Sequence, residues 1–356
     1  MIIVEKIDRI IVIDLLYLGD LLFAHPFFAG LRKLFPKTRI DLVANSNFAE
    51  IMRSNSNLDH VYSYNKNWNT TRSYKFAKKL KMNNYQLGLN IHGNWRTALL
   101  LKLIAADKNI GYGGQGRGLF LDQEIEKSNA SHVIEFYLDF LEQLKDSELL
   151  IPNLNEQQKK MNLTESAYPV LDFEKSYHKK AENKLKEIGL ENDFLVLNTG
   201  GSWNSKRWPE EYFAEIADLL AAQKHKILFV GGSADKERVA YICNKIENQK
   251  QIYNLSGKTS LLELAAILKK AKLVISGDTG PIHVAAAVGT NTFTIFGPSD
   301  EEKYAPRGKG QNILIKNIDL NCRPCGEHEC PLGHFKCMRE LTPDLVVKRL
   351  KEEELI

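Results

Sequence analysis

Asp278, Thr279, Gly280 and His283 stand where an apolar run that favours a strand changes directly into a run that favours a helix. Asp278 or Thr279 can cap that helix, and Pro281 suits its first turn. The free backbone N–H groups and the positive end of the helix dipole then point at one place, which makes an anion site. These residues predict a turn that could hold a diphosphate, with an ordinary strand-to-helix turn as the alternative.

A second group of candidates lies in the loop 198–209, which reads Asn-Thr-Gly-Gly-Ser-Trp-Asn-Ser-Lys-Arg-Trp-Pro. Gly200 and Gly201, followed by Ser202, allow a ligand to approach the backbone closely. Lys206 and Arg207 bring cationic donors to the same loop, and such charges could neutralise a leaving diphosphate. The alternative for Lys206 is a solvated surface charge.

Two further loops place carboxylates after expected strands. Asp20, next to Gly19, would stand at the start of a helix and could act as a general base on a hydroxyl group. Glu237 or Asp235 follows a Gly-Gly pair and could accept hydrogen bonds from ribose hydroxyls. The alternatives are a helix cap for Asp20 and first-turn acids that complement the helix dipole for the other two.

The cysteines are clustered: Cys243 stands alone, whereas Cys322, Cys325, Cys330 and Cys337 fall within sixteen residues. Without a secretion signal, free thiols or a metal site are favoured over disulfides. Four thiolates suit tetrahedral Zn or Fe, so a structural metal is one expectation. His328 and His334 could substitute as ligands, and a loop without metal is the alternative.

The bulk composition bounds the function class. A chain of 356 residues is long enough for two domains, and 44% hydrophobic with 26% charged residues is typical of a soluble globular protein. The net charge of +4 is mild and no dense basic stripe occurs, so a nucleic-acid partner is not expected. The apolar stretch 10–31 is interrupted by Asp14 and Asp20, which excludes a spanning helix, so we expect the chain to work in the cytoplasm.

Short apolar strands alternate with amphipathic helices along the chain, which predicts an α/β fold of two doubly wound parallel sheets. The expected strands are 9–13, 39–44, 61–64, 86–91, 194–198, 226–231, 252–255, 273–276 and 292–296. The expected helices are 20–35, 73–82, 95–105, 176–188, 209–222, 235–246, 260–270, 281–288 and 342–354. Residues 150–172 lose this periodicity, which predicts domains at 1–172 and 173–340, followed by a C-terminal segment at 341–356. Ligands should then bind at the carboxyl ends of the strands, where all the candidate loops lie.

The segment 111–116 matches the dinucleotide pattern G-x-G-x-x-G, but we expect it to follow a helix and to precede no helix. It is therefore interpreted as a glycine-rich loop. Arg117 in that loop and Arg96 earlier could meet acceptor phosphates, with plain surface charge as the alternative.

Taken together, these loops resemble glycosyltransferase family 9, the lipopolysaccharide heptosyltransferases. The residues that carry the resemblance are Leu18-Gly-Asp-Leu-Leu-Phe-Ala-His-Pro26, Gly200-Gly-Ser-Trp-Asn-Ser-Lys-Arg-Trp-Pro209, Gly277-Asp-Thr-Gly-Pro-Ile-His283 and Phe296-Gly-Pro298. The tail with Cys322-Arg-Pro-Cys325 is similar to that of the heptosyltransferase II branch. The segment 198–201, Asn-Thr-Gly-Gly, differs from this family pattern, because many relatives have a Pro-Gly pair there.

The resemblance implies a GT-B fold, with the acceptor bound by the first Rossmann-like domain and the nucleotide-sugar by the second. It implies a last helix that crosses back to the first domain. Asp20 matches the catalytic carboxylate and Lys206 the diphosphate-binding lysine. The donor-binding positions are Gly200, Gly201, Ser202, Lys206, Glu237, Asp278, Thr279, Gly280 and His283, and the acceptor-binding positions are Gly19, Arg96 and Arg117.

The activity that the resemblance implies is inverting transfer of heptose from ADP-heptose to the lipopolysaccharide inner core, without a catalytic cofactor. Its partners would be ADP-heptose, a lipid acceptor and the inner face of the inner membrane. One alternative is a transferase of the same family that uses another nucleotide-sugar or another acceptor, such as Kdo2-lipid A, another glycan or a protein. A second alternative is a protein that binds a sugar nucleotide without catalytic activity. A Rossmann oxidoreductase is disfavoured, and the Cys tail could instead be a metal-dependent assembly element.

Overall fold

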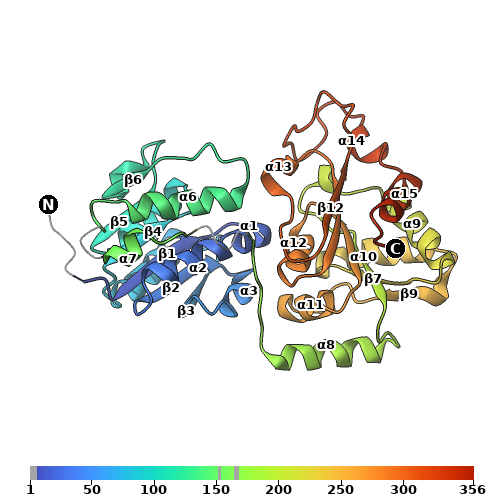
Figure 1. Cartoon of the computed structure of the whole chain (residues 1–356), viewed down its shortest axis with the longest axis horizontal. Helices are drawn as coiled ribbons and strands as arrows, with labels where there is room; N and C mark the ends of the chain where they lie inside the picture. The colour runs from blue at the N-terminus through green and yellow to red at the C-terminus, as the bar shows by residue number, and fades with distance from the viewer. Residues whose placement is uncertain (1–5, 151–153, 164–167) are drawn as a thin grey trace. The chain divides into compact units, whose positions relative to one another are not determined.

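The computed structural model describes residues 6–150, 154–163 and 168–356. The chain divides into two compact units, Met1–Pro169 and Val170–Ile356. Each unit contains a parallel six-stranded sheet flanked by helices (Figure 1). The strand orders are β3-β2-β1-β4-β5-β6 and β12-β11-β10-β7-β8-β9, so the second sheet repeats the topology of the first.

The first unit contains the following elements: β1 Arg9–Asp14, α1 Leu18–Phe23, α2 His25–Leu34, β2 Arg39–Asn45, α3 Ala49–Arg53, β3 His60–Tyr64, α4 Thr70–Lys81, β4 Leu87–Asn90, α5 Trp95–Ile104, β5 Lys108–Tyr112, the 3₁₀ turn η1 Arg117–Phe120, β6 Gln123–Ile125, α6 Val133–Lys145 and α7 Glu156–Lys159.

The second unit contains α8 Lys175–Glu187, β7 Phe194–Asn198, η3 Asn204–Lys206, α9 Glu210–Ala222, β8 Lys226–Val230, η4 Ser233–Asp235, α10 Lys236–Lys245, η5 Gln249–Gln251, β9 Ile252–Asn254, α11 Leu261–Leu268, β10 Leu273–Gly277, α12 Gly280–Ala287, β11 Asn291–Phe296, α13 Glu301–Tyr304, β12 Asn312–Lys316, α14 Lys336–Arg339 and α15 Pro343–Glu352.

The strand order places a topological switch point in each sheet. β1 pairs in parallel with β2 on one side and β4 on the other, and β7 pairs likewise with β8 and β10. The connections at the carboxyl ends of the two central strands therefore leave in opposite directions, and the crevice between them is where such sheets bind ligands. Candidate residues follow β1, β7 and β10, so each unit has a defined place for chemistry.

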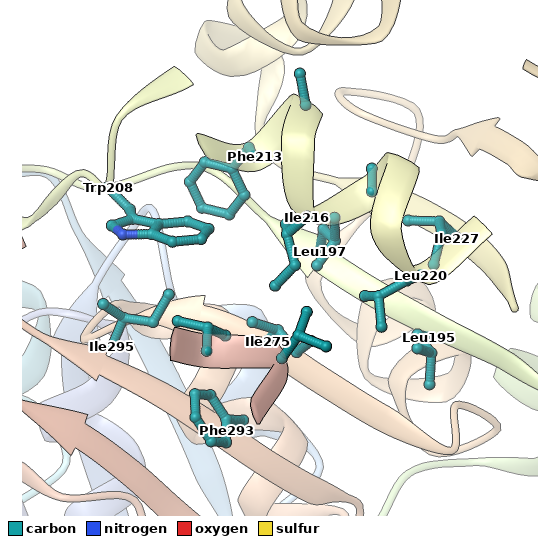
Figure 2. Packing of buried hydrophobic residues seen from close by; sticks show 14 of the residues in the cluster. Leu195, Leu197, Trp208, Phe213, Ile216, Leu220, Ile227, Ile275, Phe293 and Ile295 are labelled. Atoms are coloured by element: carbon teal, nitrogen blue, oxygen red, sulfur yellow. The ribbon is translucent and has the colours of Figure 1, made fainter. Parts of the chain in front are cut away.

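The core of the second unit packs around β7 and β10. Trp208 and Phe213 pack over strand residues such as Ile275 and Ile295 (Figure 2). The indole N–H of Trp208 donates to the carbonyl of Leu341 at 2.8 Å, which satisfies its polar atom in the core.

The C-terminal helix α15 is part of this same core. It packs against α9, and Val346, Val347 and Leu350 are buried with the strand residues of the second unit. The resemblance had implied that this segment crosses to the first domain. In the structure its apolar face packs within the second unit, and the crossing stays a prediction.

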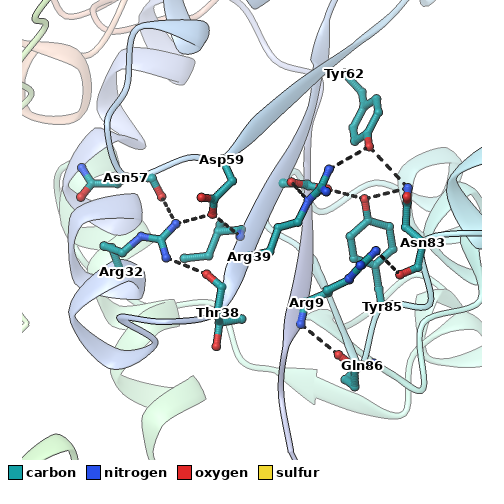
Figure 3. Close-up of polar contacts among 12 residues, drawn as sticks. Arg9, Arg32, Thr38, Arg39, Asn57, Asp59, Tyr62, Asn83, Tyr85 and Gln86 are labelled. Carbon is teal, nitrogen blue, oxygen red and sulfur yellow. Dashed lines mark hydrogen bonds and ion pairs between the residues drawn. The ribbon is translucent and has the colours of Figure 1, made fainter.

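A polar network fixes the other end of the first sheet, at the amino ends of β2 and β4 (Figure 3). The Arg32 guanidinium donates to the carbonyls of Thr38 and Asn57 at 2.6 and 3.1 Å and pairs with Asp59 at 2.5 Å. Buried Asp41 accepts from the guanidinium of Arg39 at 2.9 Å and the hydroxyl of Tyr85 at 2.6 Å. These bonds tie the sheet together far from the carboxyl ends of its strands.

The expected α/β alternation is confirmed, with differences that have local causes. The expected helix 20–35 is two helices, because α2 restarts at His25 with Pro26 in its first turn. Strands β5, β6 and β12 and helix α6 were not foreseen. The segment 111–116 begins with the last two residues of β5 rather than after a helix, and the 3₁₀ turn η1 follows it directly. The expected linker 150–172 lies partly outside the described residues.

Among the described residues, no helix combines the length and apolar character needed to cross a membrane.

Candidate functional site

Three of the predicted residues meet at the carboxyl ends of β7 and β10 in the second unit. The ammonium of Lys206 lies 2.6 Å from Asp278 Oδ2, and His283 Nε2 lies 3.2 Å from Asp278 Oδ1. Lys206 enters from η3, Asp278 follows β10, and His283 stands on α12. All three side chains are largely buried, with exposed fractions of 15%, 4% and 6%. Lys206 is thus a cation held in place near the N-terminus of α12.

The carboxylate of Asp278 is held in its charged form. Burial alone would raise its pKa, but the hydrogen bond with His283 and the charge of Lys206 outweigh burial and lower the pKa to about 2. Lys206 is also positioned by the rings around it, with its ammonium 4.4 Å from the Trp203 ring centroid and 5.8 Å from that of Tyr304.

The turn between β10 and α12 keeps the helix N-terminus open. Thr279 is the N-cap residue, but its side chain makes no cap hydrogen bond. Its hydroxyl instead lies 3.0 Å from Asn198 Nδ2 and 3.1 Å from Ser276 Oγ. Pro281 has no N–H and the Ile282 N–H donates to the Thr279 carbonyl at 3.2 Å, so the Gly280 N–H and the positive end of the helix dipole are what this N-terminus offers an anion.

Glycine is required where this turn meets the Lys206 loop. A Cβ at Gly277 would lie 2.7 Å from the carbonyl oxygen of Lys206, which real side chains do not tolerate. A Cβ at Gly201 would lie 3.5 Å from the Thr279 methyl group. The two predicted loops are therefore brought together, with their backbones in close approach.

The acid beside the Gly-Gly loops is Asp235 rather than Glu237. A Cβ at Gly200 would lie 2.9 Å from an Asp235 carboxylate oxygen, and that carboxylate accepts the N–H of Gly232 at 2.8 Å. Glu237 is exposed on the first turn of α10. The structure thus brings Asp235 to the loop that follows β7.

The segment 322–337, called the Cys-rich segment below, is hydrogen-bonded to the loop 198–209 that carries Lys206 (the Lys206 loop). Ser205 donates from its N–H to the carbonyl of His328 at 3.1 Å and from its hydroxyl to the carbonyl of Glu327 at 2.6 Å. Trp203 stacks on the His328 ring with centroids 4.2 Å apart. Sequence reasoning considered His328 as a metal ligand; in the structure this residue contacts the loop that carries Lys206.

The four clustered thiols line one small cavity of about 20 Å³, together with Ser205 and His334. Within the described part of the chain, no three His, Cys, Asp or Glu side chains are arranged to hold a metal ion. Cys322 Sγ lies 4.0 Å from His334 Nε2. The side chains as placed do not fit a bound metal, and Zn or Fe at this cluster stays a prediction.

In the first unit, Asp20 lies on the first turn of α1, after β1. Its Oδ2 accepts the N–H of Tyr17 at 3.3 Å, so one oxygen closes the capping box of the helix. Gly19 precedes it in the same turn. Asp20 is thus the third residue of the helix, whereas Tyr17 occupies the N-cap position that the alternative gave to Asp20.

Sequence reasoning missed a second carboxyl group beside Asp20. Asp14, the last residue of β1, is fully buried and accepts the N–H of Leu16 at 3.0 Å. Burial raises its pKa to about 7, and the charge of Asp20 adds to this effect. Its position directly before the predicted loop was the available signal.

Lys66 and His92 were also missed, although both follow strands of the first sheet. Burial lowers the pKa of Lys66, while the charges of Asp14 and Asp20 act in the opposite direction and Arg96 adds to the lowering. His92 accepts the N–H of Leu15 at 3.1 Å, and burial followed by the charge of Lys66 lowers its pKa to about 4, so its ring is neutral near pH 7. The switch point of this unit therefore combines two carboxyl groups with one cation.

Arg117 does not fit the acceptor role expected for it. Its side chain is buried, with 4% exposed, and its guanidinium donates to the carbonyls of Tyr112, at 3.0 Å, and Gly113. It anchors the glycine-rich loop from inside. Arg96, by contrast, is exposed on the first turn of α5, close enough to Lys66 to affect its pKa.

The relatives described here, found by comparison with known proteins, are heptosyltransferases. Lipooligosaccharide heptosyltransferase 2 of Campylobacter jejuni subsp. jejuni is 37% identical over 165 residues, or 44% of this chain and 50% of the relative. This chain thus spans about half the length of the Campylobacter relatives that it matches. Lipopolysaccharide heptosyltransferase 3 of Escherichia coli (strain K12) is 26% identical over 82% of this chain and 83% of its own.

Solved structures show the same fold. The glycosyl transferase family 9 protein of Veillonella parvula superposes with a TM-score of 0.82 at 24% identity, covering 98% of this chain and 97% of its own. E. coli ADP-heptose lps heptosyltransferase II superposes with a TM-score of 0.78 at 20% identity, covering 97% and 98%. The fold is therefore GT-B, with two Rossmann-like units.

A family model covers residues 73–336, which is well over half of the sequence and includes the Lys206 loop, the turn at Asp278 and most of the Cys-rich segment. The chain belongs to glycosyltransferase family 9 (heptosyltransferase).

Proposed function

We propose that this protein transfers L-glycero-D-manno-heptose from ADP-heptose to the inner core of lipopolysaccharide, with inversion at the anomeric carbon. The observation that carries the proposal is the Lys206–Asp278–His283 group at the open N-terminus of α12. A fixed cation beside the Gly280 N–H and the positive end of the helix dipole suits a diphosphate and stabilises the negative charge that develops as ADP leaves. Family membership supports the same reading.

The donor would bind in the second unit. The diphosphate would contact Lys206 and the α12 N-terminus near Thr279 and Gly280, with Gly200 and Gly201 allowing close approach of the nucleotide. Asp235 is the acid placed to accept from a ribose hydroxyl, so we propose it in place of Glu237. No divalent metal is needed in this scheme, because Lys206 and the helix dipole supply the positive field.

The acceptor would bind in the first unit, where Asp20 acts as the general base. The acceptor hydroxyl loses its proton to Asp20, its oxygen forms a bond to the anomeric carbon, and the bond from that carbon to the phosphate oxygen breaks. ADP leaves with the electron pair of that bond. Positive charge on the sugar ring accompanies the step, as in other glycosyl transfers. Gly19 flanks the base, and Arg96 and Lys66 are the cations placed to meet acceptor phosphates.

A lipid acceptor implies work at the inner face of the inner membrane, as a peripheral protein. The experiment that tests the function is ADP release from ADP-heptose with Kdo2-lipid A and its mono-heptosylated form, assayed side by side. Turnover on the heptosylated acceptor alone supports a heptosyltransferase II activity. Turnover on Kdo2-lipid A alone moves the assignment to the first heptose. No turnover on either refutes the proposed donor–acceptor pair.

A further inference from the structure

A groove of about 750 Å³ lies between α4 and α5 in the first unit, outside the residues assigned above except for Arg96. Its lining is mainly aromatic and aliphatic: Tyr64, Trp68, Tyr74, Trp95, Leu99, Leu100 and Leu103. Trp95, Leu99 and Leu103 follow one another at four-residue spacing, which places them along one face of α5. One face of α5 thus supplies apolar side chains to the groove.

The rim of the groove is aromatic and exposed. Tyr74 on α4 is 53% exposed and Trp95 on α5 is 58% exposed. Large amphipathic rings of this kind are enriched where a protein meets a membrane–water interface. The floor is firm, because Tyr64 and Trp68 pack edge to face with centroids 5.3 Å apart, and both contact Phe76.

Two of the polar side chains in the lining, Asn69 and Ser73, are already engaged. The Asn69 side chain accepts the N–H of Arg72 as the cap of α4, at 3.0 Å. The Ser73 hydroxyl bonds to the carbonyl of Asn69 at 3.0 Å and to the hydroxyl of Tyr64 at 2.8 Å. The rest of the lining is mainly aromatic and aliphatic, which suits a hydrocarbon chain. The lining therefore favours an acyl chain.

The charge around the groove favours an anionic lipid. Helix α4 has five basic residues and no acidic one: Arg72, Lys75, Lys78, Lys79 and Lys81. All five are exposed, and Arg96 lines the groove itself. A basic surface next to an apolar slot matches a phosphorylated head group joined to acyl chains.

We infer that the α4–α5 groove holds an acyl chain of the phosphorylated lipid acceptor while its head group faces Arg96 and the basic residues of α4. The identity of the lipid as the acceptor rests on the proposed function. The groove also lies close to the proposed base. Arg96 lines the groove and acts on the pKa of Lys66, and the charge of Asp20 acts on the same lysine. An acyl chain seated there would bring the acceptor head group towards the base.

The first test uses a brominated fatty acid, whose bromine atoms quench a tryptophan in contact with them. The protein should show saturable quenching that is largely lost when both Trp68 and Trp95, the two tryptophans of the lining, are replaced by phenylalanine. Leu99→Asp should weaken binding at least about tenfold. The matched control Leu119→Asp places the same charge on another leucine of the same unit, 83% exposed and outside the groove, and should leave binding unchanged. Equal binding by the protein and Leu99→Asp would overturn the inference.

The chain-length dependence of binding keeps the inference falsifiable if Leu99→Asp does not fold. On the unaltered protein, affinity for saturated fatty acids should rise by about fourfold per added methylene, from about 0.8 kcal/mol each, until the groove is full. An affinity that does not depend on chain length would contradict the inference. Binding that is lost in Lys78→Glu but kept in Leu99→Asp would also overturn it, in favour of a contact through surface charge alone.

Transfer kinetics separate this inference from the proposed function. With the acylated acceptor, Leu99→Asp should raise KM at least about tenfold, and with the O- and N-deacylated acceptor it should leave KM and kcat unchanged. An equal rise in KM for both acceptors would overturn the inference while transfer itself stands. If neither acceptor is turned over, the proposed function fails, and fatty-acid binding still decides whether the groove takes an acyl chain.

Discussion

Replacement of Asp14 by asparagine tests whether this buried carboxyl group is held neutral in the folded protein. Asp14 has no exposed surface, and burial raises its pKa from 3.8 to about 7. The other titratable groups that act on it are Asp20, which adds to the rise, and Lys66 and Tyr137, which oppose it. Asparagine keeps the shape of the protonated acid but cannot ionise.

The sign of the effect follows from proton binding. Since the folded pKa lies above the unfolded one, the folded chain binds more protons between pH 4 and pH 7, and the unfolding free energy falls as pH rises through this range. Between pH 5 and the folded pKa of about 7 the pH rises by about two units. At 1.36 kcal/mol per unit, the unfolding free energy falls by about 3 kcal/mol over this range. Asp14→Asn should therefore gain about 3 kcal/mol relative to the unaltered protein between pH 5 and pH 8.

The assay is hydrogen exchange of the β1 amides, because it reports the opening of the first unit without requiring both units to unfold together. Asp41→Asn is the matched control: its carboxylate is equally buried but bonded to Arg39 and Tyr85, so this variant should be destabilised throughout the same pH range. A pH-independent difference between Asp14→Asn and the unaltered protein would refute the reasoning.

The remaining predictions concern the site. Asp20→Ala should lower kcat by about 10²–10⁴-fold and leave ADP affinity nearly unchanged, as measured by initial rates and calorimetry; weaker ADP binding with intact turnover would contradict the role of base. Lys206→Ala should weaken ADP binding by about 10–100-fold, from about 1.5–3 kcal/mol per charge-assisted bond, and unchanged affinity would remove the lysine from the donor site. Arg96→Ala should raise the KM for the phosphorylated acceptor, whereas Arg117→Ala should lower the melting temperature instead; the reverse pattern would contradict the burial argument.

Much of the fold was predictable because its signals are local. The strands Phe194–Asn198 and Leu273–Gly277 are continuous apolar runs, and the capping box at Ser260 and Glu263 is confirmed, with the Glu263 N–H donating to Ser260 at 3.3 Å. Strand β5 was missed because Lys108 and Asn109 begin it and glycine interrupts its apolar pattern, so its identity depends on pairing with β4. Helix α6, with apolar residues at helical spacing, offered a clear signal that was not used.

The site was predictable to the extent that chemistry follows strands directly. Lys206 and Asp278 lie 72 residues apart in sequence, and their positions after expected strands predicted that both lie at the carboxyl ends of the sheet. The pairing of β7 with β10, which brings the two side chains together, comes from the structure. The contact between Ser205 and the Cys-rich segment could not be predicted, because irregular loops carry no periodicity that specifies their partners. The burial of Arg117 was unpredictable for the same reason: a charged side chain bonded to backbone carbonyls has the same sequence signal as an exposed one.

The measurement that tests the central claim most directly is nuclear magnetic resonance of the product formed from ADP-L-glycero-β-D-manno-heptose and mono-heptosylated Kdo2-lipid A in the presence of EDTA. We predict one new heptosyl residue with the α configuration at its anomeric carbon, formed at a rate that EDTA does not change. A β-linked product would contradict the single inverting step with Asp20 as base. Absence of any heptosylated product, with ADP-heptose intact, would contradict the proposed transfer.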